Sequence, residues 1–153
     1  MSIPETSIRM VRVFKAPVEE VFKAFTDPVL MRQWLAPTLC RVVEASADPR
    51  VGGHYRVVVK PPIGGPTITT GEYREIVPNH RLVQTWVVER SKDPAHKYPT
   101  LLTVDFKALG ADSTEITLQQ DQLITKFDRA GNLAGWGQCF KKLDRLLVSS
   151  RVA

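Results

Sequence analysis

The sequence is poor in the residues that build disulfide frameworks and metal sites. It has two cysteines, Cys40 and Cys139, without CxxC or Cys/His metal spacing, and three histidines, His54, His80 and His96, without HxxxH spacing. A small disulfide-stabilised scaffold is therefore excluded, and we expect reduced, partly buried thiols. We expect no metal and no cofactor.

Long apolar runs are also absent. The longest uninterrupted apolar stretches are only a few residues, so no segment is expected to span a bilayer. The first ten residues lack the apolar core of a secretory signal. The cytoplasm is therefore the expected location.

Charge of one sign is in modest excess and is not gathered in one place. The 21 Lys and Arg against 16 Asp and Glu leave a net charge of +5, and the basic residues are scattered singly. This pattern is typical of a solvated surface. No basic stripe alternates with exposed aromatic residues, so nucleic-acid binding is not expected.

Motifs of nucleophilic and phosphate chemistry are missing as well. No serine lies in a GxSxG elbow, and the glycine-rich residues 131–137 lack the GK[ST] ending of a phosphate loop. We therefore assign no catalytic residue and favour a binding protein over an enzyme. The glycines indicate either that a helix approaches a sheet closely or that space is left beside it.

What the chain does have is the balance of a globular domain. Its 153 residues are 43% hydrophobic and 24% charged, so residues 1–153 are expected to form a single domain. Period-two patterns and turn residues predict strands over residues 6–15, 39–45, 54–60, 68–77, 82–90, 101–109 and 115–122. Helical spacing predicts short helices over residues 17–26 and 28–35 and a long C-terminal helix whose apolar stripe is Leu133, Trp136, Phe140, Leu143 and Leu147. Short connections between consecutive strands favour an antiparallel sheet, and this order predicts an α+β fold with that sheet pressed against the long helix.

Local chemistry gives three further expectations. Asp27 is expected to cap the second short helix, with Pro28 at its first position. Asp128 or Asn132 is expected to cap the long helix. In the first strand, a slip in the alternation would turn Val11 and Val13 inward with Ile8 and Met10.

Several short motifs follow one another along the chain. They are residues 12–17 (RVFKAP), 21–22 (VF), 26–28 (TDP), 33–34 (QW), 51–56 (VGGHYR), 71–78 (GEYREIVP), 81–83 (RLV) with Trp86, 114–118 (TEITL) and 135–136 (GW). Taken together, over residues 8–147, they resemble the SRPBCC (START-like, helix-grip) superfamily. More narrowly, they are similar to the branch named for the C-terminal domain of the activator of the heat-shock protein 90 ATPase.

The resemblance implies a helix-grip fold. In such a fold a curved antiparallel sheet of about seven strands wraps around the long C-terminal helix, and two short helices follow the first strand. The resemblance also implies a cavity for an apolar or aromatic ligand between sheet and helix. Many members carry a histidine in the last strand where this chain has Gln120, an amide that cannot titrate near neutral pH.

Alternation within the strands indicates which side chains line such a cavity. Gln120 shares a face with Ile116 and Leu118, so its amide points inward and needs a partner: another side chain, ordered water, or a ligand carbonyl or hydroxyl. Both faces of residues 82–90 are compatible with burial, and we choose the face of Trp86 because tryptophan gains more from burial. The predicted lining residues are Trp34, Tyr55, Trp86, Phe106, Gln120, Trp136 and Phe140.

Three functions stay open at this point. The first is binding of a hydrophobic or aromatic small molecule in the cavity. The second is a polyketide cyclase or aromatase-like reaction in the same cavity, for which Glu72, Tyr73 or Arg74 would supply the acid or base if they point inward. The third is a co-chaperone-type activation of a heat-shock chaperone ATPase, which the family name suggests. A homodimer is left open, and no membrane partner is expected.

Overall fold

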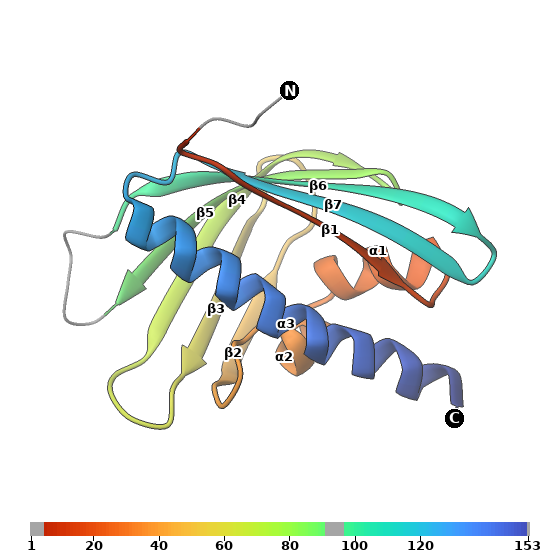
Figure 1. Cartoon of the computed structure of the whole chain (residues 1–153), viewed down its shortest axis with the longest axis horizontal. Coiled ribbons are helices and arrows are strands. Elements are labelled where there is room, and N and C mark those ends of the chain that lie inside the picture. Colours follow the sequence, from red (N-terminus) through yellow and green to blue (C-terminus); the bar gives the residue numbers. More distant parts are fainter. Residues whose placement is uncertain (1–4, 91–96, 153) are drawn as a thin grey trace.

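The chain folds around one sheet and one long helix. The computed structural model describes residues 5–90 and 97–152 (Figure 1). The elements in chain order are β1 (Ile8–Phe14), α1 (Val18–Thr26), α2 (Pro28–Trp34), β2 (Arg41–Ala47), β3 (His54–Lys60), β4 (Thr67–Val77), β5 (Arg81–Arg90), β6 (Pro99–Gly110), β7 (Ser113–Asp121) and α3 (Lys126–Val152). The predicted α+β class and the two short helices after the first strand are confirmed.

The seven strands form one antiparallel sheet in the order β1-β7-β6-β5-β4-β3-β2. Figure 1 shows that the sheet curves and that α3 crosses its concave side, as the helix-grip resemblance implies. The short helices α1 and α2 also pack against α3. The hydrophobic core lies between these helices and the concave face of the sheet.

Side-chain caps fix where two helices begin. The Asp27 carboxylate accepts a hydrogen bond from the Val29 N–H at 2.9 Å, and Pro28 follows Asp27, as predicted for α2. The predicted cap of α3 is wrong. The Thr125 hydroxyl accepts a hydrogen bond from the Asp128 N–H at 3.0 Å. Thr125 therefore takes the capping position, and Asp128 lies inside the first turn of the helix. Asn132, the other predicted cap, lies further inside the helix.

The alternation in β1 has no slip. Ile8, Met10 and Phe14 are buried, whereas Val11 and Val13 are 49% and 53% exposed, so the prediction that both valines point inward is wrong. Adjacent residues of a strand point to opposite faces of the sheet. Only one face of the sheet is covered by helices, and the two valines lie on the other.

The apolar stripe of α3 is confirmed except at its first residue. Trp136, Phe140, Leu143 and Leu147 are buried, but Leu133 is 44% exposed. In the first half of α3, the face toward the sheet carries Asp128, Asn132 and Trp136, and Leu133 falls on the flank of the helix. Within the described ranges, no helix has both the length and the apolar character that crossing a membrane requires.

Candidate functional site

The N-terminal half of α3 covers a cavity of about 350 Å³ on the concave side of the sheet. Strands β3, β4, β5, β6 and β7 contribute its floor, and the segment after α2 contributes one wall. The lining residues are Leu35, Pro37, Cys40, Val57, Val59, Pro61, Thr67, Thr69, Trp86, Val88, Tyr98, Thr100, Gln120, Leu123, Phe127, Asp128, Gly131, Asn132, Gly135, Trp136 and Cys139. Most of this lining is apolar, and it includes two tryptophans.

Small residues on α3 explain why this space is not filled. Gly131, Gly135 and Cys139 recur every four residues, so they share one helix face, and all three line the cavity. A Cβ atom at Gly131 or Gly135 would meet nothing within 4 Å. Further along α3, the buried Phe140 and Leu143 fill the space against the sheet. Of the two roles expected for the glycine-rich stretch, the structure shows that these glycines leave space.

A chain of hydrogen bonds crosses the cavity floor from helix to sheet. The Trp136 Nε1–H donates to Gln120 Oε1 at 3.0 Å, and Gln120 Nε2 donates to Thr100 Oγ1 at 2.9 Å. The Thr100 hydroxyl in turn donates to the backbone carbonyl of Trp86 at 2.7 Å. The inward amide therefore has two protein partners, and the chain links the Trp136 ring to the backbone of Trp86. Their centroids lie 5.0 Å apart with the rings tilted by 45°.

Polar groups gather at the N-terminus of α3, at the edge of the cavity. The Tyr98 hydroxyl donates to Asp128 Oδ2 at 2.6 Å and accepts from the Ile124 N–H at 3.2 Å. These bonds tie the start of β6 to the start of α3. Phe127, which precedes Asp128 in the chain, is 78% exposed although it contributes to the lining. The cavity is therefore apolar inside and polar where Tyr98 and Asp128 meet.

Three of the seven predicted lining residues line the cavity, and four do not. Trp86, Gln120 and Trp136 come together there, whereas Trp34, Tyr55, Phe106 and Phe140 lie outside the lining. That a ligand contacts the first three stays a prediction.

The four residues outside the lining belong to the packed core next to it. The Trp34 indole donates to the Ala24 carbonyl at 2.9 Å, and its ring stacks with Phe140 at 6.3 Å. Phe106 packs edge-on against Phe25 at 5.4 Å. Tyr55 lies behind Trp86, with ring centroids 5.9 Å apart. Tyr55 and Phe106 face the concave side, as alternation predicts, but all four side chains lie where the core is filled.

Sequence reasoning missed several lining residues. The sequence predicts a capping role for Asp128 or Asn132 and reduced, partly buried thiols at Cys40 and Cys139, yet all four line the cavity. Burial raises the pKa of the Cys139 thiol to about 12, so it stays protonated. The spacing of Asp128, Asn132, Trp136 and Cys139 along one helix face, with glycines between, is the signal that would have found the missed residues on α3.

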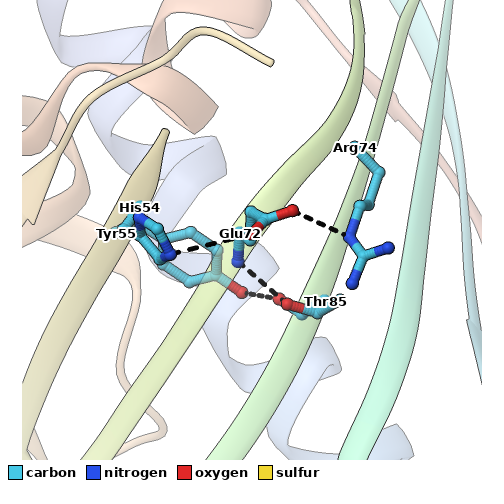
Figure 2. Close-up of polar contacts among 5 residues, drawn as sticks. All are labelled: His54, Tyr55, Glu72, Arg74 and Thr85. Atoms are coloured by element: carbon cyan, nitrogen blue, oxygen red, sulfur yellow. Dashed lines mark hydrogen bonds and ion pairs between the residues drawn. The ribbon is translucent and has the colours of Figure 1, made fainter. Parts of the chain in front are cut away.

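The charged candidates for acid or base catalysis lie on the opposite side of the sheet. Glu72 pairs with Arg74, with 3.2 Å between Oε1 and Nε, and with His54, with 3.7 Å between Oε2 and Nε2 (Figure 2). All three side chains are at least 39% exposed. Glu72 and Arg74 therefore do not point inward, which was the condition for either to supply an acid or base to the cavity. Tyr73 does point inward, but it is fully buried outside the cavity lining.

The pairing of β4 with β5 is interrupted beneath this charged group. Paired residues run from Thr67 to Thr70 and resume at Tyr73. In the gap, the Glu72 N–H donates to the Thr85 hydroxyl at 2.8 Å, and the Tyr55 hydroxyl donates to the Thr85 carbonyl (Figure 2). The side chains of Tyr55 and Thr85 thus supply hydrogen bonds that backbone groups would supply in a regular ladder.

Two neighbouring buried tyrosines should respond oppositely to loss of the hydroxyl. Burial raises the pKa of Tyr73 to about 12 and raises that of Tyr55 further, so both phenols are neutral at physiological pH. Within the described residues, the Tyr73 hydroxyl has no hydrogen-bond partner. We expect Tyr73→Phe to leave the free energy of unfolding unchanged or to raise it by up to about 1 kcal/mol, and Tyr55→Phe to lower it by about 1–3 kcal/mol. Urea denaturation of both variants checks this, and a destabilised Tyr73→Phe would contradict it.

Metal-ligating side chains do not cluster in the described part of the chain. His54 lies on β3 beside Glu72, and His80 lies in the turn between β4 and β5. His96 lies outside the described residues. Residues 5–90 and 97–152 contain no group of three or more His, Cys, Asp or Glu side chains that would hold a metal ion.

The chain is similar to known proteins over nearly its whole length. The family model described as "Activator of Hsp90 ATPase homolog 1-like protein" matches residues 15–148. A protein from Chromobacterium violaceum is 29% identical, with a TM-score of 0.80 over 93% of this chain and 96% of its own. One from Rhizobium leguminosarum is 26% identical, with a TM-score of 0.77 over 94% of each chain. The AHSA1 protein from Silicibacter pomeroyi, 19% identical, has the same fold, with a TM-score of 0.81 over 94% of this chain and 99% of its own. None of the curated proteins matches the chain.

Proposed function

The chain belongs to the Activator of Hsp90 ATPase homolog 1-like family, within the START-like fold, and from this premise we propose that it binds a hydrophobic or aromatic small molecule beneath α3. The observation that carries the proposal is the cavity of about 350 Å³ that the glycine face of α3 leaves open. This volume lies in the range of small-molecule sites, and a mostly apolar lining with a few fixed polar groups is typical of them.

The floor of the cavity suits a flat ligand. Trp86 and Trp136 offer two aromatic rings in contact with each other, and the hydrogen bond to Gln120 holds the Trp136 ring in position. A ligand that binds against these rings loses water from its apolar surface. Desolvation then supplies the affinity, and the rings supply the preference for flat molecules.

A fluorescent neutral aromatic tests the proposal. N-phenyl-1-naphthylamine is expected to bind with increased emission and to quench tryptophan fluorescence. At about 100 times its dissociation constant it should stabilise the fold by about 2.7 kcal/mol, which corresponds to a rise in Tm of roughly 5 °C or more. If neither this compound nor other neutral aromatic molecules of similar size raises the Tm, the proposal fails.

The family description also names an activator of the Hsp90 ATPase, which makes chaperone activation the second candidate. The two functions make different demands on the cavity. A ligand-binding protein loses its function when the space beneath α3 is filled, whereas an activator that acts through its surface does not. Stimulation of an Hsp90-type ATPase by the wild-type chain, and by a variant with a filled cavity, separates them.

A further inference from the structure

Thr69, on β4, brings a hydroxyl without a protein partner to the floor of the cavity. Its side chain lines the cavity and is only 6% exposed. Within residues 5–90 and 97–152, no hydrogen bond joins this hydroxyl to another group. Its oxygen is also not among the described polar atoms that the protein encloses completely without a partner. The hydroxyl is therefore open to the cavity and to a molecule bound there.

The strands on either side of Thr69 offer this hydroxyl no other partner. Thr69 lies opposite Val57 of β3 and Val88 of β5, and both valines also line the cavity. The Thr100 hydroxyl is already engaged, because it accepts from Gln120 and donates to a backbone carbonyl. A purely apolar molecule on this part of the floor would remove water from the Thr69 hydroxyl and give no hydrogen bond in return. A molecule with an oxygen at this position avoids that loss of affinity.

The Trp86 indole adds a second donor to the same floor. The indole N–H groups of Trp34 and Trp136 both donate to protein acceptors. The N–H of Trp86, in contrast, has no acceptor in the described part of the chain. Trp86 is a diagonal neighbour of Thr69 across the two strands, because Thr69 pairs with Val88. Two neighbouring lining residues thus have a donor that the protein does not use.

We propose that the cavity takes aromatic molecules that carry an oxygen acceptor, such as a ketone carbonyl, and that Thr69 binds this oxygen. The inference rests on the proposed function and names its ligand class. The Thr69 hydroxyl donates to the ligand oxygen, while the aromatic body of the ligand lies against the tryptophan rings. Thr69 therefore determines specificity, because it distinguishes a carbonyl compound from the hydrocarbon of the same shape.

Fluorene and 9-fluorenone provide the test, because they share a flat three-ring skeleton and 9-fluorenone has a carbonyl in place of the CH₂ group. Displacement of N-phenyl-1-naphthylamine measures the dissociation constant of each compound. Thr69→Val removes the hydroxyl and keeps the branched shape of the side chain. We expect it to weaken binding of 9-fluorenone by about fivefold to tenfold. Binding of fluorene should weaken by no more than about twofold, since fluorene makes no hydrogen bond to lose.

Thr70→Val is the matched control. It is the same substitution at the next residue of β4, which lies outside the cavity lining, and it should change neither dissociation constant by more than about twofold. Without ligand, Thr69→Val should not lower the Tm, because a hydroxyl without a protein partner contributes no hydrogen bond to the fold.

Three results would overturn the inference and leave the proposed function intact. They are binding of fluorene but not 9-fluorenone by wild type, an equal effect or no effect of Thr69→Val on the two compounds, and a lowered Tm of Thr69→Val without ligand. If wild type binds neither compound and does not bind N-phenyl-1-naphthylamine, the proposed function itself fails.

Discussion

Replacing Gly71 with alanine is expected to lower the free energy of unfolding by about 3 kcal/mol, and the Tm by roughly 6–12 °C. A Cβ at this position would overlap the backbone carbonyl oxygen of Thr85 and the ring and hydroxyl of Tyr55. The two obstructing groups are hydrogen-bonded to each other, because the Tyr55 hydroxyl donates a hydrogen bond to the Thr85 carbonyl. One is backbone of β5 and the other is a buried ring, so neither moves without opening the pairing of β4 with β5.

Gly110→Ala provides the matched control for this substitution. Gly110 is the last residue of strand β6, its φ is not positive, and a Cβ there would meet nothing within 4 Å. We expect this variant to stay within about 0.5 kcal/mol of wild type. Urea denaturation followed by circular dichroism measures both. If the two variants unfold at the same urea concentration, Tyr55 does not occupy the interruption between β4 and β5 as described.

The fold could be predicted from the sequence because its signals are local. The strand over residues 54–60 has the predicted bounds, since alternation defines it and glycines 52 and 53 precede it. The start of α2 was also predicted correctly, because a capping aspartate followed by a proline, Asp27 and Pro28, is a local signal. The start of α3 was missed because Thr125, Asp128 and Asn132 are all acceptable caps, and a sequence pattern does not say which one the chain uses.

The candidate site could be predicted only in part, because alternation gives the face of a residue and not its place along that face. Trp86 and Tyr55 both lie on the concave side, but only Trp86 lines the cavity. Tyr55 is held instead at the interruption beside Gly71, where the pairing of β4 with β5 is irregular, and alternation within one strand does not reveal such an irregularity. Phe106 and Phe140 likewise point the right way but lie where α1, α2 and α3 fill the space.

Gly135→Leu is expected to abolish binding of N-phenyl-1-naphthylamine while raising the free energy of unfolding. Gly135 lines the cavity from α3, and a Cβ there meets nothing within 4 Å, so the longer side chain occupies the space that the ligand needs. Glycine within a helix is about 1 kcal/mol less favourable than alanine, and leucine is close to alanine. The variant should therefore be more stable by up to about 1 kcal/mol, and its affinity for the dye should fall by at least about tenfold.

Gly137→Ala separates the helix effect from the cavity effect. Gly137 lies two residues further along α3, outside the lining, and its Cβ would make an ordinary contact with Met10 Cε at 3.9 Å. This control gains the same helix propensity, so it should gain similar stability while its affinity for the dye stays within about twofold of wild type. Fluorescence titration and thermal denaturation of both variants give the two quantities independently. A Gly135→Leu chain that binds the dye like wild type would place the ligand outside the cavity, and one that is destabilised would show that the space beneath α3 is not open.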